Sequence, residues 1–320
     1  MTPSFTVTPA ALQYLGQIER LIGRIEGLNQ PKPQPHLRRS NRVRTVHGSL
    51  AIEGNTLNLD QITALIDGRR VMAPPKDIRE VLNAIEAYDV MNRFNPFSKK
   101  DLLRAHKTMM AGLVKSAGRW RRRGVGIIKG TALSHVAPPA ERVPHLIDEL
   151  FGFLSDQTHP LLIRASVFHY EFEFIHPFED GNGRLGRFWH TLLLTSHHEV
   201  FQYIPVESLI RVHQSDYYAA LEASDRQGEA TPFIETSLAI IAEAFTEFLN
   251  DLKPEPLTPE VRLRIAAGHI GDQRFSRKDY LSLFKTISTA TASRDLRDGV
   301  QQGRLTKQGS GAQTTYQFTG

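Results

Sequence analysis

The sequence predicts a mainly α-helical protein that ends in a small α+β domain. Three observations support this. Apolar residues recur at helical spacing along most of the first 252 residues, and strand-like runs are scarce before residue 270. A proline-rich segment then separates a last part whose pattern is helices followed by two short strands. That order is typical of a winged helix-turn-helix domain.

Six segments carry the helical pattern of the first part: 12–25, 81–94, 143–154, 161–175, 185–194 and 233–252. Breaks that contain proline separate them at 32–35, 74–75, 95–96 and 138–139. The best strand signal is the short β-branched run between Gly124 and Gly130. Because it is short and lies between glycines, it indicates a hairpin or flap and not the core of a sheet.

The last part begins after residues 253–259, a linker that three prolines stiffen. Residues 260–270 are predicted to be helical, Ser276 and Asp279 can cap a second helix that runs to Phe284, and residues 288–296 lead into a third. Two short strands at 303–311 and 314–318 follow, joined by a glycine-containing loop. We therefore predict four regions: 1–95 helical, 96–252 as the main core, 253–259 as the linker and 260–320 as the winged helix-turn-helix.

Composition excludes several classes of function. The chain of 320 residues has no cysteine, which rules out disulfides, thiolate metal sites and a cysteine nucleophile and fits a cytoplasmic protein. It has no run of about 18 apolar residues, so we expect no membrane span. Its first residues show no secretory signal.

The positive charge of the chain is unevenly placed. The formal net charge is +5, and residues 258–320 contain ten basic and five acidic residues, so this stretch carries the whole excess. A basic terminal segment favours a nucleic-acid or acidic partner, although a solvated surface that happens to be basic would give the same count.

The stretch from Ile175 to Phe188 (IHPFEDGNGRLGRF) carries most of the chemical information. A helical pattern ends at Ile175, because Pro177 cannot continue it and disfavours helical backbone at His176. A glycine-rich turn follows, and a second helical pattern begins near Arg184. Such a turn points backbone N–H groups outward at a helix N-terminus, which is typical of an anion site.

Charged side chains around this turn suit a polyphosphate with its metal ion. Arg184 and Arg187 lie three residues apart in the first helical turn, so both can reach one polyphosphate. Asp180 offers the kind of carboxylate that Mg²⁺ takes together with substrate phosphates. His176 can accept a proton from an attacking hydroxyl near neutral pH. The pattern therefore predicts phosphoryl-type chemistry at this turn.

Two other interpretations of this region are weaker. Residues 181–186 satisfy G-x-G-x-x-G, but a dinucleotide site needs a strand before the turn, and here a helical run and Pro177 precede it. A zinc site would have to join His169 and His176, which lack a third ligand at the usual spacing. We expect His169, His190, His197 and His198 to be structural or on the surface.

Residues 176–187 (HPFEDGNGRLGR) resemble the Fic family signature H-x-F-x-[DE]-G-N-G-R-x-x-R at every fixed position. The resemblance implies a helical Fic core that transfers AMP from ATP to a Ser, Thr or Tyr hydroxyl of a target protein. It implies His176 as the catalytic base, Asp180 as the Mg²⁺ ligand and Phe178 as an anchor of the loop. Nucleotide contacts are implied for Asp180, Gly181, Asn182, Gly183, Arg184, Leu185, Gly186 and Arg187. Among these, Asn182 would lie near the α-phosphate and the two arginines on the β- and γ-phosphates.

The resemblance extends to a flap and to a tyrosine pair. Residues 118–121 (GRWR), 125–128 and 135–139 resemble the family's β-hairpin flap, which aligns a target segment by strand addition. Arg121 to Arg123 form a basic cluster that we interpret as surface charge. Tyr217 and Tyr218 resemble the tyrosines near the adenosine end of the nucleotide, with aromatic packing on a helix as the alternative.

Residues Ser49 to Asn55 (SLAIEGN) match the family's inhibitory motif [ST]-x-x-x-E-[GN]. Ser49 and Glu53 are four residues apart and would share one helical face, while Gly54 could simply be a helix cap. In the family the glutamate enters the nucleotide site and pairs with the second arginine, here Arg187. The resemblance therefore implies an inhibitory motif of Ser49, Glu53, Gly54 and Asn55 within the same chain.

The leading prediction is an autoinhibited protein adenylyltransferase that uses ATP and Mg²⁺ and whose target protein could be the chain itself. Transfer of another phosphate-linked group, or removal of AMP from a modified target, stays open at the same site. The alternative from a different class is a regulator that binds DNA through its basic tail and senses nucleotide. Contact of the tail with protein and formation of a homodimer also stay open.

Overall fold

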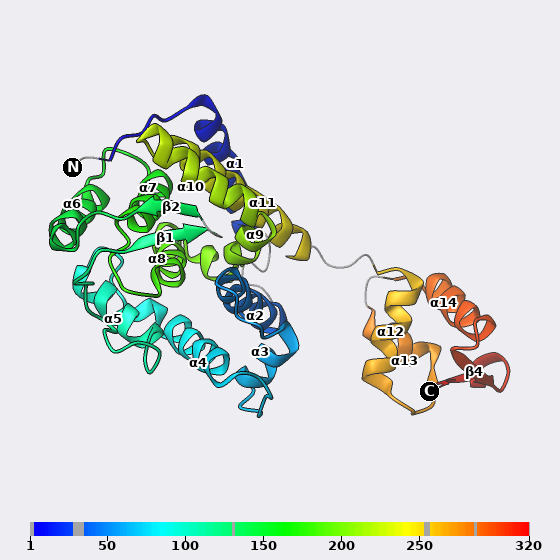
Figure 1. The fold of residues 1–320 in the computed structure, drawn as a ribbon. Coiled ribbons are helices and arrows are strands. Elements are labelled where there is room, and N and C mark those ends of the chain that lie inside the picture. The colour runs from blue at the N-terminus through cyan, green and yellow to red at the C-terminus, as the bar shows by residue number, and fades with distance from the viewer. Residues whose placement is uncertain (1–2, 28–34, 130–131, 253–256, 285–286, 320) are drawn as a thin grey trace. The chain divides into compact units, whose positions relative to one another are not determined.

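The computed structural model describes residues 3–27, 35–129, 132–252, 257–284 and 287–319. Its contacts divide the chain into two compact units, Met1–Asn250 and Asp251–Gly320. Figure 1 shows that both units are mainly helical, which confirms the predicted fold class. None of the helices in the described residues combines the length and the apolar character needed to cross a bilayer.

The helices of the first unit are α1 (Pro9–Glu26), α2 (Pro35–Ile52), α3 (Leu59–Ile66), α4 (Pro75–Asp89), α5 (Lys99–Met109), α6 (Val143–Ser155), α7 (Leu161–Ile175), α8 (Asn182–His197), α9 (Val206–Val212), α10 (Gln214–Gln227) and α11 (Thr231–Leu252). Its strands are β1 (Gly126–Lys129) and β2 (Ala132–Val136), and short 3-10 turns lie at 91–93, 140–142 and 199–203.

Helices α7 and α8 form the centre of the first unit. Every residue of α7 from Leu162 to Tyr170 is buried, so this helix has no solvent face and is stable only in the interior. It packs along α8, where Phe188 and Trp189 are fully buried, while α5 and α6 flank the pair. The loop that joins α7 to α8 is therefore carried by the most rigid part of the unit.

Helix α4 differs most from the bounds that periodicity predicts. We predicted one helix at 81–94, but α4 begins at Pro75 and ends at Asp89, and a 3-10 turn follows at 91–93. Proline is tolerated in the first helical turn, so the Pro74-Pro75 break starts the helix instead of interrupting it. The helix expected near Arg184 begins at Asn182, and α2 ends at Ile52, one residue before Glu53.

Helices α2 and α9 approach each other closely at Gly48. A Cβ atom on Gly48 would lie 2.7 Å from the backbone carbonyl carbon of Glu207, so no larger residue fits there without movement of a helix. The Ser208 hydroxyl also donates to the backbone carbonyl of Arg44, at 3.0 Å. This contact fixes the position of α2, whose last turn carries Ser49.

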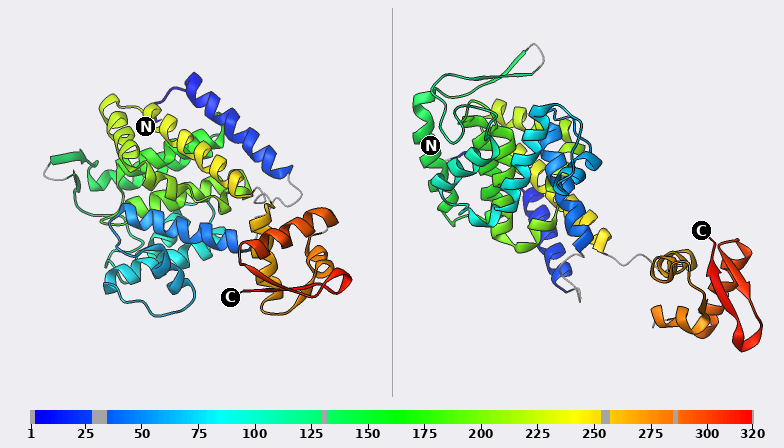
Figure 2. Two further views of the ribbon diagram at one scale, coloured as in Figure 1. Left: turned by 90° about the vertical axis from the view of Figure 1, so that its right-hand side faces the viewer. Right: turned by 90° about the horizontal axis from the view of Figure 1, so that it is seen from below.

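Strands β1 and β2 form the predicted hairpin. They are antiparallel, with a bulge between Ile127 and Ile128. The right-hand view of Figure 2 shows that the hairpin extends away from the helices of its unit. Among the described residues this sheet consists of β1 and β2, so the outer edge of each strand has no neighbouring strand there.

The second unit contains α12 (Pro259–Ile270), β3 (Phe275–Ser276), α13 (Arg277–Leu283), α14 (Thr289–Gln301), β4 (Leu305–Gln308) and β5 (Thr315–Phe318). The strands form an antiparallel sheet in the order β3-β5-β4. The predicted Ser276 and Asp279 capping box is present, whereas β3 is too short for a sequence signal. Residues 253–256 of the predicted linker lie outside the described residues.

One ion pair of the second unit is buried, so the charged residues counted between 258 and 320 do not all lie on the surface. Asp295 is 1% exposed and accepts hydrogen bonds from Arg262 at 2.6 and 2.8 Å and from the Tyr280 hydroxyl at 3.1 Å. Arg262 and Asp295 are therefore parts of the core, and the remaining basic residues of the tail carry the same net charge.

Candidate active site

The loop between α7 and α8 begins with a backbone turn at His176. Its φ of 49° is the single positive value at a non-glycine residue among the described residues. A left-handed conformation at such a residue costs on the order of 1 kcal/mol and persists only where the surroundings impose it. Pro177 follows directly, which ends α7 and turns the His176 side chain out of the helix.

Arg121 holds the backbone of this turn. Its Nε donates to the carbonyl of His176 at 2.7 Å, its Nη2 donates to that of Ile175 at 3.2 Å, and its backbone N–H donates to that of Pro177 at 2.9 Å. The same guanidinium donates to the carbonyls of Arg123 and Pro138, at either end of the hairpin. Arg121 is only 2% exposed, so its assignment to a basic surface cluster was wrong.

His106 on α5 contacts the loop at Phe178 and Asp180. Its ring stacks on Phe178 with centroids 3.6 Å apart, and Phe178 is fully buried. Burial lowers the pKa of His106 to about 4, so the ring is neutral near pH 7. The backbone N–H of Gly118 donates to Nδ1 at 2.8 Å, which leaves the proton on Nε2 for the carbonyl of Asp180 at 3.0 Å. The sequence analysis did not identify His106, because a histidine on an amphipathic helix gives no signal of its own.

The side chain of Asn182 binds the backbone of its own loop at Phe178. Its side-chain oxygen accepts from the backbone N–H of Phe178, and its amide nitrogen donates to the Phe178 carbonyl, both at 2.9 Å. Gly181 has a φ of 86°, and a Cβ there would lie 2.6 Å from the sulfur of Met110. With its side chain used in this way, Asn182 can offer a phosphate its backbone N–H at the start of α8.

Arg184 faces one side of the loop. It pairs with Glu80 at 2.9 Å and with Asp180 at 2.6 Å. Glu80 also accepts from the Asn55 amide at 2.9 Å, so the segment Ser49–Asn55 and the loop meet at this carboxylate. Glu80 on α4 is a second site residue that the sequence analysis missed, since nothing in α4 distinguishes it from a surface acid.

Arg187 binds the segment Ser49–Asn55. It donates to the backbone carbonyl of Ser49 at 2.9 Å, to the Ser49 hydroxyl at 3.3 Å and to the Glu53 carboxylate at 2.8 Å. Burial alone would lower the pKa of Arg187, but Glu53, Tyr217 and Glu173 together outweigh burial and raise it above its usual value. The structure thus brings together Ser49, Glu53 and Arg187, as the resemblance implied.

Glu53 lies at the N-terminus of α8. A Cβ on Gly183 would be 2.3 Å from the Glu53 oxygen Oε1, so the carboxylate rests directly on the first turn of the helix. The segment can turn here because Gly54 has a φ of 85°, and the N–H groups of Gly54 and Asn55 close the end of α2. The carboxylate therefore occupies the place where the helix dipole and free N–H groups favour an anion.

A second carboxylate, that of Glu173 on α7, is an electrostatic neighbour of Arg187. Its Oε1 atom is buried, and a Cβ on Gly186 would be 2.4 Å from it. Burial raises the pKa of Glu173 to about 7, with Arg187 opposing and Glu53 adding to the shift. Gly186 therefore faces α7, and Leu185 is fully buried, so of these two predicted nucleotide residues neither presents a side chain to the site.

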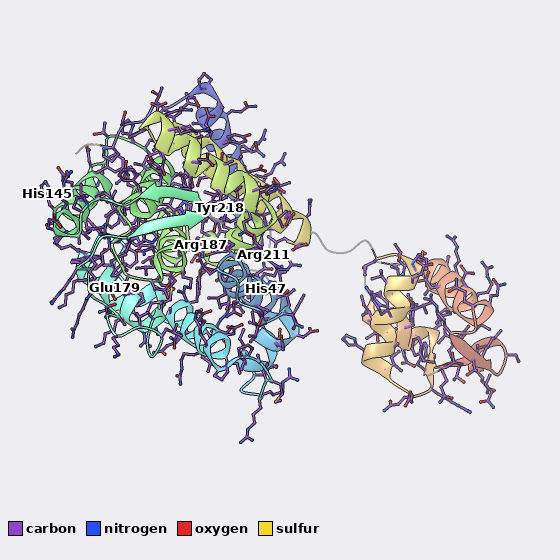
Figure 3. The ribbon with its side chains drawn as sticks, viewed as in Figure 1. His47, His145, Glu179, Arg187, Arg211 and Tyr218 are labelled. Atoms are coloured by element: carbon purple, nitrogen blue, oxygen red, sulfur yellow. The ribbon has the colours of Figure 1, made fainter. Side chains whose placement is uncertain are left out.

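The tyrosine pair divides between the core and the site. Tyr217 is 3% exposed and its hydroxyl lies 2.8 Å from Nε2 of His169, which is the packing role that we gave as the alternative. Tyr218 is half-buried, and its electrostatic neighbours include Glu53 and Arg187. Figure 3 shows Tyr218 and Arg187 in the same region of the first unit.

The carboxylate of Asp180 fits the expected Mg²⁺. Its side chain is 47% exposed, whereas the side chain of its partner Arg184 is 5% exposed. Part of the carboxylate is therefore accessible from solvent. In the described part of the chain no three His, Cys, Asp or Glu residues gather around a metal site. That arrangement suits an ion whose other ligands are substrate phosphates and water.

Comparisons with known proteins agree with this site. A model of the Fic/DOC family matches residues 96–194. The chain is 30% identical over 203 residues to the protein adenylyltransferase fic-1 of Caenorhabditis elegans, covering 59% of this chain and 37% of that protein. It is 26% identical over 263 residues to the protein adenylyltransferase Fic of Culex quinquefasciatus, covering 72% of this chain and 50% of that one. The chain thus spans half or less of the length of these two curated relatives.

Solved structures extend the similarity to both units. A Fic family protein from Desulfovibrio desulfuricans G20 is 38% identical, with a TM-score of 0.80, over 100% of this chain and 99% of that chain. Residues 134–508 of Fic-1 from C. elegans share the fold, with a TM-score of 0.61 at 22% identity over 76% of this chain and 73% of that one. Because its similarity to the D. desulfuricans protein covers the whole chain, the chain belongs to the Fic family.

Proposed function

We propose that this chain is a protein adenylyltransferase that Glu53 holds inactive. The observation that carries the proposal is the loop from His176 to Arg187, which places an imidazole and an open carboxylate beside a helix N-terminus and its two arginines. Two relatives of this chain are named protein adenylyltransferases. Their shared chemistry supports ATP as the nucleotide and a protein hydroxyl as the acceptor.

The residues divide the reaction between them. His176 accepts the proton of the target hydroxyl, whose oxygen forms a bond to the α-phosphorus of ATP while the bond to the β-phosphate oxygen breaks and pyrophosphate leaves. Asp180 would hold Mg²⁺, which neutralises the phosphate oxygens. Arg184 and Arg187 pair with the outer phosphates once their present carboxylate partners give way.

Inhibition follows from the position of Glu53. The carboxylate takes a donor of Arg187 and the anion position on the first turn of α8, both of which the terminal phosphate needs. Two negative groups cannot share this small site without repulsion, so ATP must displace Glu53 or bind in another position. We therefore expect low basal activity.

The test uses the mass of the protein itself. Glu53→Gly should give covalent adducts with ATP and Mg²⁺ that the wild type forms weakly, and Glu53→Gly with His176→Ala should form none. The adduct mass distinguishes AMP from UMP or phosphate, and incubation of a modified target with the wild type reveals any removal of AMP. An absence of adducts on both the Glu53→Gly variant and added proteins would contradict the proposal.

The hairpin supports a protein as the second substrate. An edge strand can pair with an extended segment of a target, and β1 and β2 extend beyond the helices of their unit. Main-chain pairing would align a target hydroxyl without reading most of its side chains.

We also propose that the second unit contacts DNA. The order of α12, α13, α14 and the β4–β5 hairpin is that of a winged helix-turn-helix, and α14 presents Arg294 and Arg297 to solvent. Full-length protein should shift duplex DNA in a gel, and the shift should weaken steeply as salt rises. No shift at low salt would leave the unit as a protein-binding module.

A further inference from the structure

Arg187 binds Ser49 and Glu53 with different parts of its guanidinium group. Nε donates to the Ser49 hydroxyl at 3.3 Å, and Nη2 donates to the Ser49 carbonyl at 2.9 Å and to the Glu53 carboxylate at 2.8 Å. Nη1 forms no hydrogen bond with a described residue, and it lies 3.1 Å from the position that a Cβ on Gly183 would take. Departure of Glu53 would therefore leave Arg187 with two hydrogen bonds, both to Ser49.

Ser49 and Glu53 lie on opposite sides of the end of α2. Ser49 is 3% exposed and lies within the helix, next to the contact of Gly48 with α9. The Glu53 side chain is 34% exposed, follows the last residue of α2 and precedes the turn at Gly54. Glu53 can reach water by a change in this turn, whereas Ser49 can leave only if the helix moves. The two contacts with the guanidinium group can therefore be broken separately.

A buried carboxylate that the proposed reaction does not use lies beyond the Ser49 hydroxyl. Glu207 on α9 is 1% exposed, and its Oε1 accepts from the hydroxyls of Tyr88 at 2.8 Å and Thr191 at 2.7 Å. Burial and then Glu207 raise the pKa of the Tyr88 hydroxyl, and a hydrogen bond from the Ser49 hydroxyl opposes them. Because a carboxylate has no proton to donate, it takes the single proton of Tyr88, and the proton of Ser49 points to the Tyr88 oxygen. The oxygen of Ser49 is then left to accept from Nε of Arg187.

These contacts hold Arg187 in one position before a nucleotide arrives. An arginine side chain has many rotamers, and a contact that selects one of them in advance lowers the entropic cost of binding. With Nε and one N–H of Nη2 on Ser49, the group turns Nη1 to the first turn of α8, where an anion is favoured.

We propose that Ser49 positions Arg187 for the terminal phosphate of ATP, with Tyr88 and Glu207 directing the Ser49 hydroxyl. Ser49 and Glu53 then have opposite effects on ATP binding, although the resemblance places both in one inhibitory motif. Ser49 remains on Arg187 in the inhibited and the active state, and Glu53 is the partner that the phosphate replaces. This inference rests on the proposed function, in which Arg187 binds ATP.

The test is the Kd of ATP with Mg²⁺, measured by calorimetry on the full chain with Glu53→Gly and His176→Ala as the parent. Ser49→Ala in this parent should raise the Kd of ATP about three- to tenfold, the loss of one hydrogen bond to a charged group. The Kd of AMP should stay as in the parent, because AMP has no outer phosphate for Arg187. Ser166→Ala, at a fully buried serine of α7 with its own hydrogen bonds, is the matched control and should leave both constants unchanged.

The contribution of Tyr88 is measured in the same parent. Tyr88→Phe should raise the Kd of ATP about threefold, because the Ser49 proton loses its acceptor and the hydroxyl can turn away from Nε. Tyr170→Phe is the control, since the Tyr170 hydroxyl also donates to a carboxylate, that of Asp225 at 3.0 Å, and should leave the Kd of ATP unchanged. An unchanged Kd in Tyr88→Phe would contradict the role of Tyr88 and Glu207.

Three results would overturn the role of Ser49. An equal Kd of ATP in the parent and Ser49→Ala would show that the hydroxyl does not position Arg187. A lower Kd in Ser49→Ala would make Ser49 part of the inhibition. An equal rise for ATP and AMP would show general damage to the site. In each case the parent still binds ATP, so the proposed function stands, whereas a parent that binds no ATP would contradict both.

Discussion

At the scale of residues, the position of His176 depends on hydrogen bonds from side chains to the backbone of its loop. The sequence predicted His176, Asp180, Arg184 and Arg187, because each lies within one short motif whose chemistry is local. It assigned Arg121 to the surface, because three arginines in a row look solvated when the carbonyls that they could bind are unknown. The ends of α7 and of the hairpin supply those carbonyls, and only the folded chain brings them together.

Arg121 should act as a positioning residue for His176. In the Glu53→Gly background, Arg121→Gln should lower kcat on the order of tenfold to a hundredfold, since a small misplacement of a reacting group has costs of that size. The KM for ATP should change little, because Arg121 contacts no residue that we assign to phosphate binding. Arg121→Lys should recover part of kcat, as it restores a single donor.

The neighbouring Arg122 provides the control, because it is exposed and Arg122→Gln should leave kcat unchanged. A kcat of Arg121→Gln equal to that of its parent would contradict this role, and so would a rise in KM alone.

Glu173 should make stability depend on pH. Burial raises its pKa from 4.5 to about 7, so the folded state binds a proton that the unfolded state has already released. This contribution is full below pH 4.5 and is lost as the pH rises through about 7. The free energy of unfolding of the wild type should therefore fall relative to Glu173→Gln over that interval.

Urea unfolding of both proteins across this pH range measures the difference. Burial raises the pKa of Glu171 to about 7 as well, but that residue is present in both proteins and its effect cancels. Parallel pH profiles of the two proteins would show that Glu173 titrates normally.

At the scale of elements, inhibition depends on where α2 ends. The sequence predicted that Ser49 and Glu53 act together, but it could not place α2 relative to α8, because that placement comes from contacts between distant segments. The close approach at Gly48 supplies it, with α9 on one side and the Ser49–Arg187 contact on the other. A glycine inside a helix is a weak signal in sequence, and here it marks the tightest contact of α2.

Gly48→Ala should disturb this contact. The added Cβ would lie 2.7 Å from the backbone of Glu207 and Ser208, which cannot rotate away, so we expect a loss of stability of about 1 to 3 kcal/mol. Because α2 shifts with its contact, basal adduct formation should rise above that of the wild type.

Gly16→Ala in α1 is the matched control, because a Cβ there meets nothing within 4 Å. It should stabilise the helix slightly and leave activity as it was. If Gly48→Ala melted like Gly16→Ala, the close packing of α2 on α9 would not hold.

At the scale of the molecule, the chain joins a helical unit that carries the candidate site to a small second unit. Helical periodicity predicted α6, α7 and α11 well, because long amphipathic or buried segments repeat a clear pattern. It did not predict β3 or the 3-10 turns, which are too short to show a period, nor the buried pair of Arg262 and Asp295, which composition counts as surface charge. The site as a whole joins segments that are far apart in sequence: Ser49–Asn55, Glu80, His106, Arg121 and the loop.

The proposed inhibition is a competition in which Glu53 and the terminal phosphate of ATP bind the same arginine and the same helix end. The most direct measurement is the Kd of ATP with Mg²⁺ for the wild type and for Glu53→Gly, by calorimetry with His176→Ala present in both to prevent turnover. Removal of the carboxylate should lower the Kd about tenfold or more, the effect of freeing one charged hydrogen-bond donor. The same Kd in both proteins would contradict the account.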